Sequence, residues 1–455
     1  MKFLKKNFKG KLLSDEKILH VYNSDATVIS TGKLYPPELV IFPESIEDIV
    51  KIIKHCRTRK IPLFFRGGGT GMTGGASISR PKSVMISSEK LIKISPPNFQ
   101  DNLIQVEAGV IPDDLNNYLC KTGYFYPPAP ASSGISTIGG NISENSNGLN
   151  VFKYGTTGDW VRGLTFITGS GEVLRVGGIY KKSVAGYALK DLIIGSEGTL
   201  GFIFDAKLSI IRIPEALWGI SLFFDSIKEG LKFVRLIHET GYKPAIFEFI
   251  DTFSLKASEL YKKINIPKET KALVILKFEG LKPEIKYLEI LIKNFIKNFD
   301  IFCHSNTNTE EGFSELMDMR KGISPALFNI ARGKINEDLV IPISQLEDFF
   351  KFIHKVQRRF KLKIAVFGHI GYGNLHTNIM YDPGSAIDMK NLQNLLDELI
   401  DFVINIGGSI TGEHGVGLTK KKYLKKELGG VNLKISKEIK KIFDPDNIIN
   451  PGKIF

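Results

Sequence analysis

Residues 66–76 read RGGGTGMTGGA and directly follow the apolar stretch Pro62–Arg66, which has the composition of a short strand. The segment formally matches the pattern GxGxxG. A dinucleotide-binding fold would continue that pattern into a long helix with an acidic residue about 20 positions later. Pro81 and the β-branched residues around it exclude such a helix. The loop is therefore either a tight turn or a backbone cradle for a pyrophosphate, because N–H groups after a strand are free to bind one.

Glycine is over-represented along the chain. There are 44 glycines in 455 residues, where an average usage of roughly 7% would give about 32. The surplus gathers in residues 67–75, 134–178, 195–201, 368–373 and 407–417. Clusters without a repeat period exclude collagen-like and low-complexity chains. They indicate tight loops in which the backbone comes close to something else.

Two further loops resemble the first in character. Residues 127–155 read PPAPASSGISTIGGNISENSNGLNVFKYG, a stretch rich in Ser, Gly and Asn and almost without charge. A loop of this length within a compact domain is usually functional or disordered, and the apolar anchors Ile135, Ile138 and Ile142 favour order around a large ligand. Residues 195–201, GSEGTLG, lead into another strand. Three such loops predict one large ligand of several parts.

The net charge of +13 does not identify a partner. Only 12 of the 61 basic residues are arginine, and the lysines are dispersed without interleaved aromatic residues. A nucleic-acid surface would concentrate them, so no nucleic acid is expected. The three cysteines contain no CxxC pair, which indicates a reducing compartment. Neither a signal peptide nor a membrane span is recognisable, so the sequence predicts a cytoplasmic protein, at most peripheral to the membrane.

The pattern of elements predicts an α+β protein of two domains. Short strands, short helices and glycine turns alternate up to residue 213, which indicates a first domain of mixed sheets over residues 1–213. Residues 214–406 instead alternate long apolar segments with amphipathic helices such as Ile227–Glu239 and Gln345–Arg358, and form a second domain. Residues 407–455 return to glycine loops and then to a helix near Ile435–Phe443.

Two of the eight histidines lie in GHIGYGNLH, residues 368–376. If this segment were one helix, His369 and His376 would be about 10 Å apart along its axis, too far to share a metal. If it is a hairpin turning at Tyr372 and Gly373, His369 faces His376 directly, with Cβ atoms roughly 5 Å apart. Asn378 then shares their face of the sheet.

A hairpin would place two imidazoles on one ion. Glu413 in the motif GEHG would complete a site of two histidines and one carboxylate with open positions, as in catalytic metal centres. The alternative is a hairpin whose histidines are incidental.

Several motifs together resemble one enzyme family. They are FPES at 42–45, RGGGTGMTGGA at 66–76, STIGGNISEN at 136–145, KYGTTGDWVRGL at 153–164, VAGYALKDLIIGSEGTLG at 184–201, GHIGYGNLH at 368–376, GGSITGEHGVGLTK at 407–420 and FDPDNIINPGKIF at 443–455. On these residues the chain resembles the FAD-linked D-2-hydroxy-acid dehydrogenases, of the glycolate oxidase catalytic-subunit and D-lactate dehydrogenase type, within the vanillyl-alcohol oxidase superfamily. The resemblance covers about residues 36–455.

The resemblance implies a vanillyl-alcohol-oxidase-type FAD-binding domain, a second α+β substrate (cap) domain, and a C-terminal segment that returns to the first. It also implies non-covalent FAD, because no histidine stands in the first glycine loop where some relatives attach the flavin. The residues implied to bind FAD are Arg66, Gly67, Gly68, Gly69, Thr70, Gly71, Met72, Gly74, Ser132, Ser133, Ile138, Gly139, Gly140, Asn141, Ser143, Glu144, Asn145, Gly148, Tyr154, Gly155, Gly195, Glu197, Gly198, Leu200, Gly201, Ile203 and Asn450.

By the same resemblance, His369, His376 and Glu413 match metal ligands, with zinc the favoured ion. His414 matches the general base, and Arg320 and Asn378 match positions that hold the substrate. Departures from the family pattern are Ala129, Ala188 and Tyr372, where aspartate is common, and Ile343, where arginine is common.

The implied activity is oxidation of a lactate- or glycolate-type D-2-hydroxy acid to the 2-oxo acid. Electrons then pass to a quinone, a carrier protein or a partner subunit. The alternatives are a D-2-hydroxyglutarate-type dehydrogenase, an FAD-binding subunit without turnover of its own, and a metal-dependent hydrolase. The hydrolase would leave three glycine loops unexplained.

Overall fold

The computed structural model describes residues 4, 8, 10–27, 33–260 and 266–455, without the side chains of 302 and 303. The chain divides into two compact units, each described here by itself. The first unit comprises Met1–Gly148, Gly155–Ile213 and Glu413–Phe455, and the second comprises Leu149–Tyr154 and Pro214–Gly412. The chain thus returns to the first unit after residue 412 rather than after 406, and a short piece of the predicted first domain belongs to the second unit.

The first unit contains a four-stranded sheet in the order β1-β2-β4-β3. Its strands are β1 (Lys11–Leu13), β2 (Leu39–Phe42), β3 (Leu63–Arg66) and β4 (Val84–Ser87). Strands β2, β3 and β4 are parallel, as expected for strands joined through a helix. That helix is α3 (Ile46–Thr58), and Ser45 caps it by accepting a hydrogen bond from the backbone N–H of Asp48.

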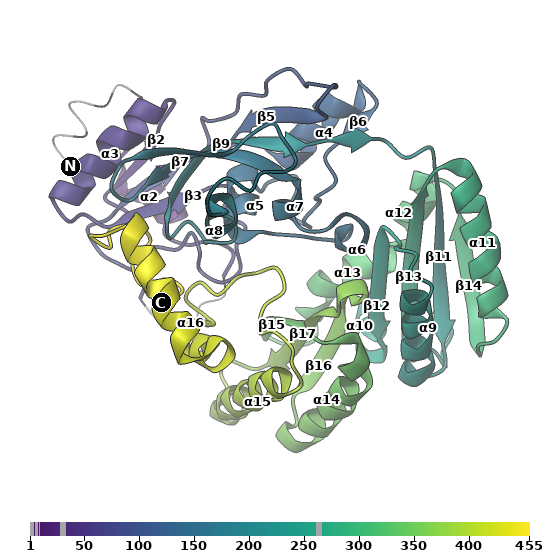
Figure 1. Ribbon diagram of the computed structural model, residues 1–455. Coiled ribbons are helices and arrows are strands. Elements are labelled where there is room, and N and C mark those ends of the chain that lie inside the picture. Colours follow the sequence, from purple (N-terminus) through teal and green to yellow (C-terminus); the bar gives the residue numbers. More distant parts are fainter. Residues whose placement is uncertain (1–3, 5–7, 9, 28–32, 261–265) are drawn as a thin grey trace. The chain divides into compact units, whose positions relative to one another are not determined.

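A second sheet of the first unit is antiparallel, in the order β5-β9-β7-β8 (Figure 1). Helix α5 (Ile138–Glu144) packs on β5 and β9. The strand that residues 195–201 lead into is β9, and Ile210 separates it from β10, which pairs with β6. The strands and short helices of this region are β5 (Leu103–Glu107), β6 (Tyr124–Phe125), β7 (Val161–Thr168), β8 (Val173–Gly177), β9 (Gly201–Ser209), β10 (Ile211–Arg212), α4 (Pro112–Cys120), α7 (Thr157–Trp160) and α8 (Leu189–Ile193).

The end of the chain belongs to the first unit. Helix α16 (Leu424–Phe443) begins 11 residues before the helix predicted near Ile435, and Gly429 interrupts it with a φ of 74°. Beyond it, Asn450 donates its backbone N–H to the carbonyl of Leu63 at 2.8 Å. The remaining elements of this unit are α2 (Glu16–Leu19), η1 (His20–Tyr22) and η4 (Lys421–Tyr423).

The second unit is built on one seven-stranded antiparallel sheet, in the order β14-β11-β13-β12-β16-β17-β15 (Figure 1). Its strands are β11 (Ala216–Phe224), β12 (Ile246–Asp251), β13 (Ala272–Gly280), β14 (Ile301–Thr307), β15 (Gly333–Val340), β16 (Lys363–His369) and β17 (Asn374–Tyr381). Its helices are α6 (Val151–Tyr154), α9 (Ile227–Glu239), α10 (Thr252–Ser258), α11 (Lys282–Ile296), α12 (Glu310–Leu316), α13 (Asp318–Leu327), η2 (Ile343–Gln345), α14 (Leu346–Phe360), η3 (Ile370–Tyr372) and α15 (Ala386–Asn405).

The two faces of this sheet carry different helices. Phe249 points to the face covered by α9 and α14, where its ring packs against that of Phe350 with centroids 5.3 Å apart and planes tilted at 54°. Side chains alternate along a strand, so Glu248 points to the other face. There α10, α12 and α13 close an apolar cluster that includes Ile250, Ala365 and Phe367. The predicted α+β class is confirmed by both units.

The predicted hairpin is present, but its register is wrong by two residues. His376 pairs with Phe367 rather than with His369, and His369 pairs with Glu248 of β12. The reason is the connection: residues 370–372 form a short 3₁₀ turn that Gly373 closes in the left-handed region, at φ 71°. The loop therefore takes four residues between the strands instead of the two assumed for a tight turn.

Of the predicted free cysteines, Cys56 is buried and Cys120 is exposed, and the side chain of Cys303 lies outside the described residues. Within the described ranges, none of the helices has both the length and the apolar composition needed to cross a bilayer.

Candidate functional site

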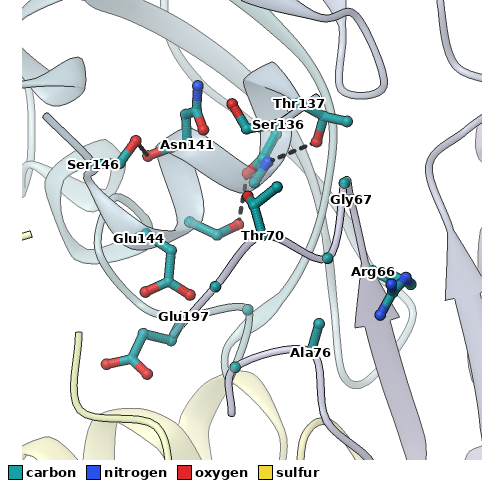
Figure 2. A pocket seen from close by; sticks show the side chains of 18 of the residues that line it. Arg66, Gly67, Thr70, Ala76, Ser136, Thr137, Asn141, Glu144, Ser146 and Glu197 are labelled. Atoms are coloured by element: carbon teal, nitrogen blue, oxygen red, sulfur yellow. Dashed lines mark hydrogen bonds between the residues drawn. The ribbon is translucent and has the colours of Figure 1, made fainter. Parts of the chain in front are cut away.

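The first unit holds a pocket at the meeting point of its glycine loops (Figure 2). Of the residues predicted to bind FAD, those that line it are Arg66, Gly67, Gly68, Gly69, Thr70, Gly71, Met72, Ser132, Gly139, Gly140, Asn141, Ser143, Glu144, Glu197, Gly198, Gly201, Ile203 and Asn450. Glu413 and His414 line the same pocket. Segments that are distant in sequence thus form one cavity wall, which a single large ligand can contact along its length.

Glycine is required in the first loop because other backbone lies against it. A Cβ atom on Gly68 would come within 2.3 Å of the carbonyl oxygen of Ile135, and one on Gly67 within 2.3 Å of Thr137 Oγ1. Gly69 adopts a φ of 69°, which L-residues rarely take. The 66–76 loop therefore packs against residues 135–137, backbone to backbone at Gly68, and this fixes the pocket wall. The predicted loop over 127–155 is not continuous, because it contains α5 and α6.

Helix α5 is held at both ends by local capping. Thr137 accepts the backbone N–H of Gly140, and Asn145 ends the helix in the left-handed conformation. Asn145 Oδ1 also accepts the N–H of Gly158 at 2.8 Å, which ties α5 to α7. The cap positions Asn141 and Glu144 on the pocket side (Figure 2).

Several polar atoms in this wall are buried without a hydrogen-bond partner among the described residues: Ser88 Oγ, Ser136 Oγ, Asn141 Nδ2, Glu144 Oε2 and Asn450 Oδ1. All five residues line the pocket. Because burying an unsatisfied polar group is costly, the pocket is built for a ligand with many polar atoms. A cofactor with phosphates, a ribityl chain and a ring system fits this wall.

Some residues expected to bind FAD lie behind the wall or elsewhere. Ile138 and Leu200 are in the hydrophobic core, and Gly148 packs against the carbonyl of Ala129. Tyr154 belongs to the second unit, where its phenol donates to Glu279 at 2.6 Å. The others outside the pocket lining are Gly74, Ser133, Asn145, Gly155 and Gly195.

Sequence reasoning also missed part of the wall. The additional lining residues are Phe65, Gly75, Ala76, Ser88, Ala108, Pro130, Ala131, Ser136, Thr137, Ser146, Asn147 and Phe202. Ser136 and Thr137 are the first two residues of the motif at 136–145, so taking the whole motif as the binding set would have included them. Ala108 and Ser88 carry no local signal.

In the second unit, one face of the sheet carries a cluster of polar side chains. His369 and His376 lie on this face with ring centroids 5.4 Å apart and ring planes at 83°. His369 is hydrogen-bonded through Nδ1 to the carboxylate of Glu248, and Arg320 Nε of α13 donates to the other oxygen of that carboxylate. A carboxylate on one ring nitrogen orients the other nitrogen toward a metal.

Glu248 remains ionised although it is fully buried. Burial would raise the pKa of this carboxyl, but the charges of His369 and Arg320 and the hydrogen bonds from both lower the pKa to about 2. The hydrogen bond to Glu248 occupies the Nε–H group of Arg320. The two terminal nitrogens of the guanidinium are therefore the donors that Arg320 can offer to a substrate carboxylate.

The neighbouring strand contributes Asp338, which is fully buried. Its Oδ1 accepts a hydrogen bond from Asn374 Nδ2 at 2.6 Å and lies 3.9 Å from His376 Nδ1. Its Oδ2 accepts the backbone N–H of Gly412 at 2.8 Å. Asp338 thereby holds Gly412, the last residue of the second unit, and Glu413 follows in the chain.

Asn378 and Asn336 face each other across β17 and β15, and the Oδ1 atoms of both are buried without a partner among the described residues. Lys334 lies on the same face of β15, donates to Ser324 Oγ at 2.7 Å, and burial lowers its pKa to about 8. Sequence reasoning found Asn378 but missed Glu248, Asp338 and Lys334.

Glu413 and His414 open the last segment of the first unit. His414 Nε2 lies 3.6 Å from Glu413 Oε1, and the carbonyl of His414 accepts a hydrogen bond from Thr73 Oγ1 at 2.9 Å. The next residues are also anchored, because Glu197 accepts the backbone N–H groups of Val416 and Gly417, each at 2.7 Å. These bonds fix the backbone at His414 and directly after it.

The departures Ile343 and Tyr372 line a separate cavity of the second unit, together with Phe152 and His238. Phe152 packs against Phe247, which points to the opposite face from Glu248 because side chains alternate along β12.

Comparison with known proteins agrees with the assignment of the first unit's pocket to FAD. Residues 37–177 match the model of an FAD binding domain, and residues 213–454 match that of the C-terminal domain of FAD linked oxidases. The chain belongs to the FAD-linked oxidase family. It is 34% identical to glycolate oxidase subunit GlcD of Bacillus subtilis over 96% of this chain and 92% of that protein. It is 30% identical to D-lactate dehydrogenase of Anaerostipes hadrus, over 92% and 89% of the two chains.

Among curated relatives, a D-2-hydroxyglutarate dehydrogenase of Stutzerimonas stutzeri is also 30% identical, over 98% of this chain and 96% of that protein. Solved structures share the fold. A 4-ethylphenol oxidase from Gulosibacter chungangensis has a TM-score of 0.78 at 17% identity, covering 99% of this chain and 95% of that chain. A p-cresol methylhydroxylase has the same score at 16% identity, covering 97% and 93%. This member of the FAD-linked oxidases has the vanillyl-alcohol-oxidase-type fold.

Proposed function

We propose that this FAD-linked oxidase converts a D-2-hydroxy acid of the lactate or glycolate type to the 2-oxo acid. The observation that carries the proposal is that Glu413 and His414 line the same pocket as the FAD-binding glycine loops. A titratable imidazole is thereby placed beside the cofactor site. The relatives named for glycolate, D-lactate and D-2-hydroxyglutarate all act on 2-hydroxy acids, and this supports the substrate class.

The chain's own residues supply binding and proton transfer. FAD, when bound, supplies the acceptor for the hydride that leaves Cα of the substrate. His414 takes the proton of the substrate hydroxyl, so the carbonyl forms as both hydrogens leave. Arg320, held by Glu248, binds the substrate carboxylate, and Asn378 offers its buried amide oxygen.

The donor set also fits a divalent metal. His369 and His376 present two imidazoles on one sheet face, and Glu413 is the carboxylate that the family resemblance adds to them. We infer that these three residues are the ligands and that zinc is the ion, because two histidines and a carboxylate are typical of zinc sites. Such an ion would act as a Lewis acid for the hydroxyl oxygen.

The test is an anaerobic panel of D- and L-2-hydroxy acids, monitored by the loss of flavin absorbance in the purified holoenzyme. We expect D-lactate or glycolate to bleach the flavin and the L-enantiomers to leave it oxidised. If no 2-hydroxy acid bleaches it, the chain is an FAD-binding subunit without turnover. If D-2-hydroxyglutarate alone is effective, the substrate assignment moves to that acid.

The role of His414 has its own test. The variant His414→Ala should retain bound FAD, because the imidazole is not needed to shape the glycine loops. Its rate of flavin reduction should fall about 10²–10⁴-fold, as expected when a general base is removed. A stopped-flow measurement at saturating substrate decides this, and an unchanged rate would exclude His414 as the base.

We further propose a cytoplasmic protein that passes electrons to a quinone, a carrier protein or a partner subunit, with peripheral association to the membrane where the acceptor is a quinone. Reoxidation of the reduced enzyme by soluble quinone and by dioxygen, compared under the same conditions, tests the acceptor.

A further inference from the structure

Glu144, the last residue of α5, lines the pocket of the first unit. Its Oε2 atom is buried and has no hydrogen-bond partner among the described residues. An unsatisfied carboxyl oxygen in such a place is costly. The partner of Glu144 is therefore expected from the ligand that fills the pocket.

A second carboxyl group lies beside it. A Cβ atom built on Gly415 would lie 2.6 Å from Glu144 Oε2 and 3.0 Å from Glu197 Oε1, so the two carboxyls converge at this glycine. Figure 2 shows the side chains of Glu144 and Glu197 in the pocket wall. Gly415 directly follows His414. The pair consequently lies next to the residue that follows the proposed base. The other oxygen of Glu144, Oε1, would be 2.8 Å from a Cβ atom on Gly75, so this side chain also touches the end of the 66–76 loop.

The two carboxyls differ in what they bind. Burial raises the pKa of Glu197 too, but Glu197 accepts two backbone N–H groups, and these hydrogen bonds act against that rise by favouring the ionised form. Glu144 has no comparable donors. Burial and then the charges of Glu197 and Asp25 raise the pKa of Glu144 well above its usual value, while Lys453 opposes this. Two adjacent carboxyls do not both ionise readily, so Glu144 is the one that keeps its proton.

We propose that Glu144 is a neutral carboxylic acid that donates its O–H to the bound flavin and thereby raises the flavin's midpoint potential. The inference rests on the proposed assignment of this pocket to FAD. A reduced flavin carries more negative charge than an oxidised one, and a fixed donor stabilises the form with more negative charge. An ionised glutamate at the same place would act in the opposite direction.

The test compares the midpoint potential of bound FAD in wild-type holoenzyme, Glu144→Gln and Glu144→Met, by equilibration with reference dyes at pH 7. Gln keeps a neutral donor of similar size, so its potential should stay close to wild type. Met removes the donor, and the equilibrium constant for reduction should fall about tenfold, which is about 30 mV for a two-electron couple. Ser83→Ala is the control, because Ser83 Oγ is also buried and unpartnered among the described residues but does not line the pocket.

A second measurement does not depend on the Met variant folding. Infrared difference spectra of wild type and Glu144→Gln at pH 7 should show the carbonyl band of a neutral carboxylic acid in wild type only, and that band should shift when FAD is added. Absence of the band, or an equal potential in Met-substituted and wild-type holoenzyme, overturns the proposal while leaving FAD binding intact. If wild-type protein does not bind FAD, the proposed function fails instead.

Discussion

The pocket of the first unit is walled largely by backbone, whereas the polar face of the second unit is made of side chains. In the first unit, Gly67 and Gly68 lie so close to residues 135–137 that no Cβ fits between them. In the second unit, His369, Glu248 and Arg320 form a chain of hydrogen-bonded side chains on a sheet. We therefore expect ligand binding in the first unit to be impaired by added side-chain volume, and metal binding in the second unit to be impaired by the removal of a charge.

The largest effect is expected from adding volume to the backbone wall. In Gly68→Ala the new methyl group would meet the backbone at Ile135 and Ser136, which a side-chain rotation cannot relieve. FAD binding should weaken by more than about 100-fold, so the purified variant should be colourless. Gly430→Ala is the control, since a Cβ there has nothing within 4 Å. A yellow, stoichiometric Gly68→Ala protein would contradict a wall built from backbone.

A smaller effect is expected from removing charge in the second unit. Glu248→Gln keeps the shape of the side chain but removes the carboxylate that orients His369 and holds Arg320. Losing such a partner of a metal-ligating histidine typically costs 10–100-fold in metal affinity. Competition with a chelator measures this loss, with FAD content expected to stay unchanged. Glu347→Gln, on the surface of α14, is the matched control, and equal zinc affinity in both variants would exclude a metal role for this face.

The smallest effect is expected on the pH dependence of stability. It concerns Lys453, a buried charged side chain in the unit whose pocket wall is otherwise mostly backbone. Burial lowers the pKa of Lys453 to about 7, and its ammonium donates to the carbonyl of Gly75. The unfolded chain binds a proton at this lysine up to about pH 10.4, so unfolding takes up a proton above pH 7. This contribution makes folding more favourable as pH rises through that window, by at most about 1.4 kcal/mol per pH unit.

Replacing the lysine should remove that slope. Relative to Lys453→Met, the wild-type protein should gain free energy of unfolding between pH 7 and 9.5, measured by urea denaturation at each pH. Parallel pH profiles of the two proteins would show that Lys453 keeps its charge when buried.

Local signals in the sequence predicted most of the first site and less of the second. Gly67, Gly68 and Asn141 lie in contiguous stretches whose composition predicted a large ligand, and the family resemblance then named them individually; all three line the pocket. Glu248 was not, because its contact with His369 comes from the pairing of β12 with β16, more than 100 residues apart. A pattern of alternating apolar residues predicts where a strand lies in the sequence, but it does not predict which other strand it pairs with in the sheet.

The hairpin register illustrates the same limit at short range. The residues of the turn were correctly placed between two strands, but the sequence does not distinguish a two-residue turn from the 3₁₀ turn that Gly373 closes. The two alternatives differ in which residue faces His376, and only the wider loop pairs His369 with another strand.

The insertion of residues 214–412 between two parts of the first unit has a consequence for biosynthesis. On the ribosome, the whole seven-stranded sheet emerges before Glu413–Phe455, the segment that supplies Asn450 and Lys453 to the first unit. Domains generally fold as units during synthesis. The second unit can therefore form its core before Glu413–Phe455, which the first unit needs, has been translated. FAD binding is therefore expected only after residues 413–455 have been translated.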